Sequence, residues 1–195
     1  MRYKVERKQH NSRLCFVCGL KNDLGLKAEF YETDQGEIVA MFTPIEEHQS
    51  YPGRMHGGIA SAILDETIGR AVQIGREEQI WGVTLELKTR FHKPIPLDQP
   101  LKVVGRITKE SHRIFEGSGE IYLPSGEKAV SAEGRYLKQA IGSISDFDTE
   151  ENDWRVVPRE NDPAVIELES PGSTGSTGSA GSTGSTGSTG SAGSI

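Results

Sequence analysis

The sequence predicts an α+β domain in which an antiparallel sheet wraps around one long helix. In the first 145 residues, two strand-like segments are followed by one helical segment and then by four strand-like segments. The connections among the later segments are too short to hold a crossover helix, so their strands must run antiparallel. The single helix therefore has one sheet to cover it.

The first two strands are expected in residues 24–31 and 38–42. Apolar and polar residues alternate through the first of these ranges. A turn at 34–36 and a proline at position 44 bound the second range, which is typical of a hairpin.

The helix is expected in residues 59–74, after a loop that ends in Gly57 and Gly58. At about 100° per residue, its apolar side chains occupy an arc of roughly 180°, so other elements must cover about half of its surface. The residues of this arc are Ile59, Ala60, Ile63, Leu64, Ile68, Ala71 and Ile74. Small residues on the remaining side favour contact with a partner subunit.

Four further strands are expected in residues 83–91, 101–109, 114–123 and 128–137. In the first of them, regular alternation predicts two faces. One face would hold Val83, Leu85, Leu87, Thr89 and Phe91, and the other Thr84, Glu86, Lys88, Arg90 and His92.

Charge and composition divide the 195 residues into a domain over 1–145, an acidic extension over 146–170 and a tail over 171–195. The net charge is −6, of which residues 146–169 supply −7, with 9 acids and 2 bases. The tail repeats Gly, Ser, Thr and Ala and is expected to be a flexible coil, either a natural low-complexity segment or a linker.

The nearly neutral domain argues against nucleic-acid binding, which requires a concentrated basic surface. No apolar run approaches the roughly 18 residues of a membrane span, and no secretory signal follows the first residues, so we expect a cytoplasmic protein. No metal constellation is apparent. Cys15 and Cys18 form a lone CxxC for which three readings stay open: a zinc site shared between chains, a redox pair, and two small buried thiols at a turn, the last being favoured.

Two adjacent acids on the helix need different explanations. Glu66 precedes Arg70 by four residues, which predicts a solvated ion pair. Asp65 has no basic residue at helical spacing, so it is either exposed or required for chemistry.

The start of the helix offers a complement to that acid. The first amide groups of a helix lack acceptors, and Gly57 and Gly58 let a ligand approach them closely, so they can stabilise negative charge on a carbonyl oxygen. Asp65 lies too far along the same helix to reach that carbonyl carbon. A site between two subunits is the geometric solution.

These motifs together resemble the hotdog-fold acyl-CoA thioesterases of the 4-hydroxybenzoyl-CoA and phenylacetate-pathway (PaaI-like) type. The resemblance covers about residues 15–138. It rests on His56-Gly57-Gly58, on Asp65 nine residues after the histidine, on Gly82-Val83-Thr84-Leu85, on Phe91-His92-Lys93-Pro94, and on the opening Cys15-Phe16-Val17-Cys18-Gly19 with Gly25-Leu26.

The resemblance implies a hotdog fold, assembly into dimers or tetramers, and a thioester bound between two subunits. It implies no cofactor apart from the coenzyme A of the substrate. By the same resemblance, the Gly57 amide donates to the thioester oxygen, Asp65 of the facing subunit acts as nucleophile or general base, and the Thr84 hydroxyl helps to hold the water.

Substrate-binding residues are implied in the same way. His56 orients the loop that holds Gly57 and Gly58. Relatives often have Asn or Gln where Ser50 stands, as a donor near the leaving sulfur, so Gln49 or His48 substitutes or the role is absent. Candidate partners for the coenzyme A phosphates are Arg90, Lys93 and Lys128, and the acyl pocket would be shaped by Ile63, Ile68, Trp81 and Phe91. Apart from that role for His48, we expect His48, His92 and His112 to be surface or strand-end residues.

Hydrolysis of an acyl-CoA thioester is therefore the expected activity. A non-catalytic acyl-CoA binding module is the main alternative, because Ser50 departs from the family pattern. A hotdog dehydratase or hydratase is the third reading, and the aspartate at thioesterase spacing argues against it.

Overall fold

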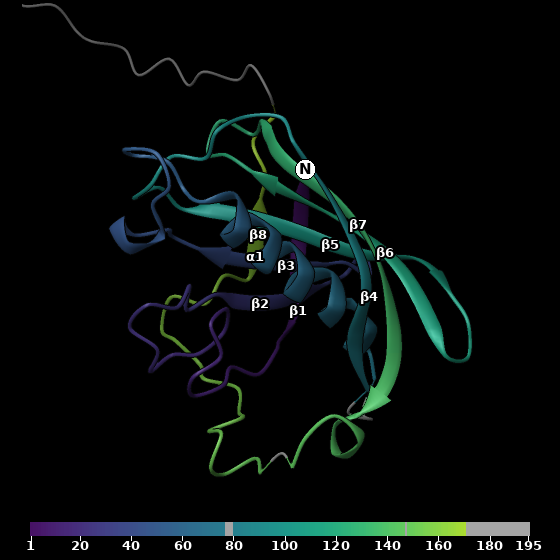
Figure 1. Ribbon diagram of the computed structural model, residues 1–195. Coiled ribbons are helices and arrows are strands. Elements are labelled where there is room, and N and C mark those ends of the chain that lie inside the picture. The colour runs from purple at the N-terminus through teal and green to yellow at the C-terminus, as the bar shows by residue number, and fades with distance from the viewer. Residues whose placement is uncertain (77–79, 147, 171–195) are drawn as a thin grey trace, which may run out of the picture.

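The computed structural model describes residues 1–76, 80–146 and 148–170. In this part of the chain, one helix lies across the concave face of an eight-stranded sheet (Figure 1). The helix is α1 (Gly57–Arg70), and the strands are β1 (Arg2–Lys8), β2 (Glu29–Thr33), β3 (Ile38–Phe42), β4 (Ile80–Phe91), β5 (Leu101–Glu110), β6 (Ile114–Tyr122), β7 (Lys128–Ala140) and β8 (Val165–Glu167). Short 3-10 turns occur at Glu46–His48, Ala71–Gln73 and Ile141–Ser143.

The strands follow the order β4-β7-β6-β5-β3-β2-β1-β8, and every neighbouring pair is antiparallel. This confirms the predicted α+β class, with an antiparallel sheet around one helix. With 14 residues, α1 is the longest helix in the described ranges, and none there has the length and apolar character to cross a membrane.

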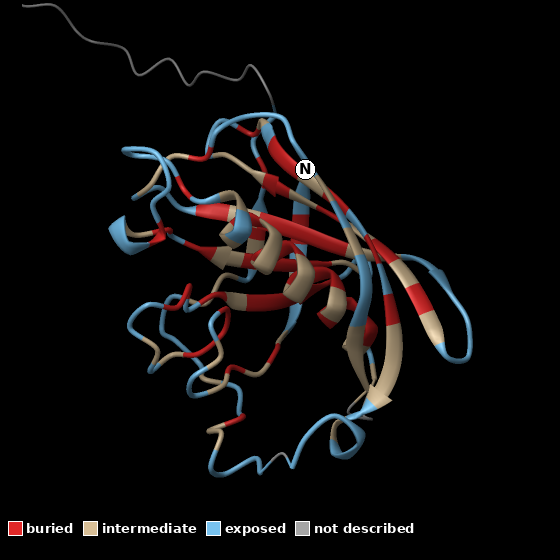
Figure 2. Ribbon diagram, viewed as in Figure 1, coloured by how far each residue is buried: buried red, intermediate tan, exposed pale blue. Residues whose placement is uncertain are grey.

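The apolar stripe of α1 faces the sheet, as predicted. Ile63, Leu64 and Ile68 are fully buried. The helix sits close to the sheet because glycines lie beneath it: a Cβ atom at Gly117 would come within 2.5 Å of the Ile68 side chain, and one at Gly105 within 2.9 Å of Thr67. In Figure 2, the central strands behind α1 are coloured mainly as buried.

The helix is displaced from its expected range. It begins at Gly57 because the His56 side chain caps it, with Nδ1 accepting a hydrogen bond from the Gly58 amide at 2.9 Å. It ends at Arg70, where the Ala71 amide bonds the Ile68 carbonyl and the tighter turn at Ala71–Gln73 follows.

The strand expected in residues 24–31 is largely wrong, because β2 starts only at Glu29. The amides of Leu26 and Ala28 instead bond the carbonyls of Phe16 and Val17. The preceding loop therefore forms hydrogen bonds with backbone groups that a longer strand would have used to pair with the sheet.

Two strands of the sheet were not expected from the sequence. β1 pairs with β2 on one side and with β8 on the other. β8 belongs to the acidic segment 146–170, and it brings Ile166 and Leu168 into a buried cluster with Tyr3 and Tyr31. The predictions for the tail over 171–195 concern residues outside the described ranges.

Candidate active site

A bulge in β4 decides where Thr84 points. Thr84 pairs with Tyr136 and Glu86 pairs with Arg135, so Leu85 is an extra residue and is 52% exposed. An extra residue in a strand reverses the alternation on one side of it. The prediction of two regular faces is therefore wrong, and Thr84 faces α1 while Glu86 and Lys88 line a hollow with residues of β6 and β7.

Asp65 of α1 receives two hydroxyl hydrogen bonds on the same carboxylate oxygen. Thr84 donates to Oδ1 at 2.8 Å, and the Tyr136 hydroxyl donates to it at 3.2 Å. The second oxygen, Oδ2, has no hydrogen-bond partner among the residues described. The carboxylate is thus held in place while one oxygen stays available for chemistry.

Partial burial raises the pKa of Asp65 above its ordinary value, because removal from water disfavours the charged form. The hydrogen bonds from Thr84 and Tyr136 oppose this shift, and neighbouring Glu66 adds to it. Burial also raises the pKa of Tyr136, and the charge of Asp65 reinforces that rise, so Tyr136 stays a protonated donor. A carboxylate with a raised pKa is a stronger base than an exposed one.

Tyr136 is the site residue that the sequence did not indicate. It lies on β7, is fully buried and stacks on Phe115 with ring centroids 4.9 Å apart. Aromatic residues are common in strands, so nothing in its sequence context distinguishes it from a core residue.

The start of α1 keeps one backbone donor free. The Gly58 amide bonds His56 Nδ1, and the amides of Ile59 and Ala60 bond the His56 carbonyl. The Gly57 amide has no acceptor among the described residues. His56 thus has the orienting position that was expected of it. The Gly58 amide already donates to His56, so it is not free to bind a ligand.

A cavity of about 360 Å³ opens beside Gly57. Its volume lies within the range of small-molecule sites. The lining residues are Ser50, Tyr51, Arg54, Met55, Gly57, Ala60, Phe91, His92, Lys93, Pro94, Ile95 and Val130. The cavity therefore brings together three of the predicted site residues, Ser50, Gly57 and Lys93.

Other predicted residues lie elsewhere. Gln49 Oε1 accepts the Gly53 amide at 2.7 Å within its own turn. Arg90 and Lys128 line a separate hollow, where Lys128 lies 3.7 Å from Glu120. Of the four residues expected to shape an acyl pocket, Phe91 lines the cavity. Trp81 instead packs against Trp154, with ring centroids 4.8 Å apart.

Two predictions about charged and polar side chains are wrong. His48 is 1% exposed, with its ring nitrogens at 3.0 Å from the Ile45 amide and the Leu24 carbonyl, so it is neither a surface residue nor a free donor. The Glu66–Arg70 ion pair forms at 2.8 Å, as predicted, but it is not solvated, because the Arg70 side chain is 5% exposed. The Arg70 guanidinium lies over the rings of Phe30 and Trp154.

Within one chain, the two halves of the site stay apart. Neither Asp65 nor Thr84 lines the cavity beside Gly57. Asp65 follows Gly57 by eight residues on the same helix, which corresponds to about 12 Å of rise.

A family model described as the thioesterase superfamily matches residues 52–130. This segment spans the cavity loop, α1, β4, β5 and β6. The antiparallel sheet around one helix matches the hotdog fold of thioesterase-superfamily proteins. We found no curated protein sequence that matches the chain.

Solved structures share this fold. A thioesterase superfamily protein of known crystal structure shares 30% identity over 62% of this chain, with a TM-score of 0.57, and the match spans 58% of that protein. A phenylacetic acid degradation-related protein from Ralstonia eutropha shares 19% identity over 57% of this chain and 85% of its own, with a TM-score of 0.53. The PaaI protein of E. coli shares 15% identity over 59% of this chain and 81% of its own, also at 0.53.

Proposed function

We propose that this protein hydrolyses an acyl-CoA thioester to a free acid and coenzyme A, at a site formed by two copies of the chain. The observation that supports this most is the division of the site. One end of α1 offers a free amide beside a cavity, and a basic carboxylate lies two turns further on, out of its reach. Two antiparallel helices lying side by side would unite the two halves.

The edge strand β4 is the element through which two copies would pair. It is 12 residues long, and its outer edge has no neighbouring strand among the described residues. None of its residues is buried, and Leu85 and Phe91 are 52% and 55% exposed. Long exposed edges are templates for pairing with another chain.

A specific register would complete the site. Along β4, Phe91 lies beside Gly57, and Thr84 bonds Asp65. If two β4 strands pair about a two-fold axis at Lys88, with Leu85 left out of the pairing as the extra residue of the bulge, Phe91 of one copy lies opposite Thr84 of the other. That pairing would place the Asp65 carboxylate of one copy against the cavity of the other.

The residues would then have distinct roles. The Gly57 amide, at the positive end of the helix dipole, would stabilise the oxyanion, to which one donor typically contributes about 3 kcal/mol. Asp65 would act through Oδ2, either by attacking the acyl carbon or by taking a proton from the attacking water. Ser50 would offer its hydroxyl to the leaving sulfur, and Arg54 would meet phosphate oxygens at the cavity mouth.

The test is a thiol-release assay over short, medium, long and aromatic acyl-CoAs, with wild type and Asp65→Asn compared directly. Asn keeps an oxygen that accepts from Thr84 and Tyr136, so the fold should persist, but it is no base. We expect Asp65→Asn to lose at least about a hundredfold in kcat. Near-normal turnover by Asp65→Asn would reject the assignment.

A non-catalytic acyl-CoA binding module is the second candidate, and the short Ser50 side chain in the cavity favours it. Tight binding of an acyl-CoA by calorimetry, together with no thiol release by wild type, would support this candidate and contradict hydrolysis.

A further inference from the structure

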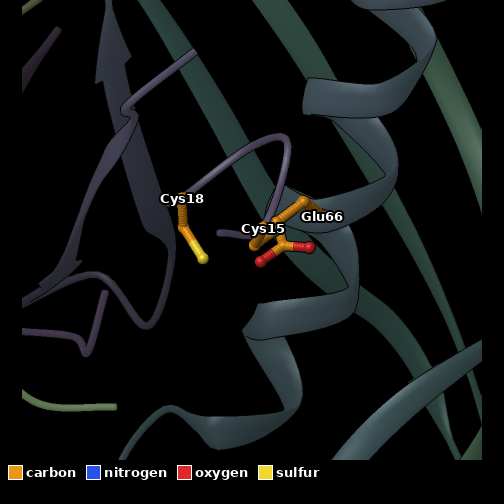
Figure 3. Close-up of side chains that lie close together, drawn as sticks. All are labelled: Cys15, Cys18 and Glu66. Atoms are coloured by element: carbon orange, nitrogen blue, oxygen red, sulfur yellow. The ribbon is translucent and has the colours of Figure 1, made fainter. Parts of the chain in front are cut away.

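A second cluster of reactive groups lies outside the proposed thioesterase site. Cys15 and Cys18 come from the loop between β1 and β2 and face Glu66 of α1 (Figure 3). The two sulfur atoms and a Glu66 carboxylate oxygen all lie within 4.8 Å of one another. Both cysteines are free thiols, and the proposed hydrolysis uses neither of them.

Cys18 occupies a buried position beside a positive charge. It is 1% exposed, and its sulfur lies 3.3 Å from the Ser12 hydroxyl. The Arg70 guanidinium is 4% exposed, donates to Glu66 through Nε, and has no hydrogen-bond partner for Nη2 among the described residues. A thiolate on Cys18 would give this buried cation a second anionic neighbour.

The two thiols differ in their affinity for the proton. A hydrogen bond from Cys15 lowers the pKa of Cys18 to about 7, against the effect of burial and with the help of Arg70. The same hydrogen bond, followed by burial, raises the pKa of Cys15. When this pair loses one proton, the negative charge therefore lies mainly on Cys18.

The two thiols also differ in their exposure to solvent, and here the more exposed one is Cys15. Cys15 is only partly buried, whereas Cys18 is enclosed. An oxidant of peptide size can meet Cys15 but not Cys18. With the two sulfur atoms within 4.8 Å of each other, the reachable thiol can accept an oxidant and the enclosed one can then displace it as the resolving cysteine.

We infer that Cys15 and Cys18 form a reversible redox pair that small disulfides, such as glutathione disulfide, oxidise to an intramolecular disulfide. In the first step, the Cys15 proton passes along the hydrogen bond to the Cys18 thiolate, the Cys15 thiolate so formed attacks one glutathione sulfur, and the other glutathione leaves as a thiolate. In the second step, Cys18 gives this proton to the released glutathione, and its thiolate attacks the Cys15 sulfur and expels the second glutathione as a thiolate. The two cysteines lose two electrons, and one glutathione disulfide becomes two glutathione molecules.

The same three residues suit a metal ion less well. They would supply three ligands, whereas structural zinc takes four. A cation there would also lie close to the buried guanidinium of Arg70, which already binds the carboxylate of Glu66 at 2.8 Å. These contacts favour redox chemistry over metal binding.

The experiment uses the full chain, incubated anaerobically in glutathione buffers of increasing oxidised fraction, quenched with acid and measured by intact mass spectrometry. We expect wild type to lose the mass of two hydrogen atoms and to regain it with dithiothreitol. Cys18→Ser should instead gain one glutathione, because the resolving thiolate is missing. Cys15→Ser should stay unmodified, because Cys18 is enclosed. Circular dichroism checks that each variant is folded.

Three results would overturn the inference. One is a wild type that keeps both thiols in the most oxidising buffer, although the urea-unfolded chain reacts. Another is equal addition of glutathione to the two single-cysteine variants. The third is one zinc ion bound per chain that protects both thiols. The first and third are measured on wild type and do not depend on how the variants fold.

Discussion

At the scale of single residues, two opposing effects act on the pKa of Asp65. Hydrogen bonds from Thr84 and Tyr136 favour its charged form, and burial disfavours it more strongly. Its raised pKa means that the folded chain binds a proton on this carboxyl more tightly than the unfolded chain does. The carboxylate that is poised for chemistry therefore lowers the stability of the fold.

The raised pKa of Asp65 predicts how the stability of the fold depends on pH. A group with a raised folded-state pKa stabilises the fold below its unfolded pKa, and this contribution is lost as pH rises through the folded pKa. Asp65→Asn never ionises, so it should melt at a higher temperature than wild type at neutral pH, with the difference shrinking as pH falls toward the ordinary aspartate value of 3.8. Thermal denaturation across pH measures this. A difference that grows on acidification would contradict the burial of the Asp65 charge.

Some of these residues could be identified from the sequence and others could not. Gly57 and Asp65 stand out because a single helix defines their separation. The Glu66–Arg70 pair is equally local, yet its burial depends on Phe30 and Trp154, which are distant in sequence. Tyr136 reaches Asp65 only through the pairing of β7 with β4, which no local pattern encodes.

At the scale of elements, β4 shows what periodicity cannot reveal. Its sequence alternates regularly from Val83 to Phe91, but the bulge at Leu85 turns the two halves of the strand to opposite faces. The bulge allows Thr84 and Phe91, which are seven positions apart, both to face α1, where one holds Asp65 and the other covers Gly57.

The cap of α1 supports a second prediction. His56→Ala removes the acceptor for the Gly58 amide and should cost about 1 kcal/mol of unfolding free energy. His56→Asn is the matched control, because its side-chain oxygen can accept the same hydrogen bond. Urea denaturation of the two variants measures the difference. Equal loss of stability in both would show that the hydrogen bond is not what the histidine contributes.

The register proposed for β4 supports a third prediction, by cross-linking. Opposed residues in antiparallel strands have Cα atoms about 4.5 to 5.5 Å apart, which lies within the range that a disulfide spans. The double variant Thr84→Cys with Phe91→Cys should form a covalent dimer in air, visible on a non-reducing gel. Each single variant should stay monomeric on the same gel, because its new cysteine faces no equivalent cysteine across the axis. Cross-linking by a single variant would indicate a different register.

At the scale of the whole molecule, the two edges of the sheet differ. β8 covers one edge and is preceded by a segment whose Trp154 packs near Arg70 and Trp81. The few apolar residues of 146–170 show no periodicity, so the sequence does not predict where they pack. The partner of Ile166, for example, is Tyr3, more than 160 positions away.

The other edge, β4, remains open in the single chain, and the proposed activity depends on what pairs with it. The most direct measurement mixes two inactive variants. Gly57→Pro removes the amide donor at the first position of α1, where proline is well tolerated. Asp65→Asn removes the base. Each homodimer lacks one half of both sites, whereas a mixed dimer contains one intact site.

The variants are unfolded together, refolded at equal amounts and assayed for thiol release, with each variant refolded alone as the control. Random assembly makes half of the dimers mixed, each with one of its two sites intact, so we predict about one quarter of wild-type activity. Activity no greater than that of the separate variants, in a mixture shown to contain mixed dimers, would contradict a site shared between two chains.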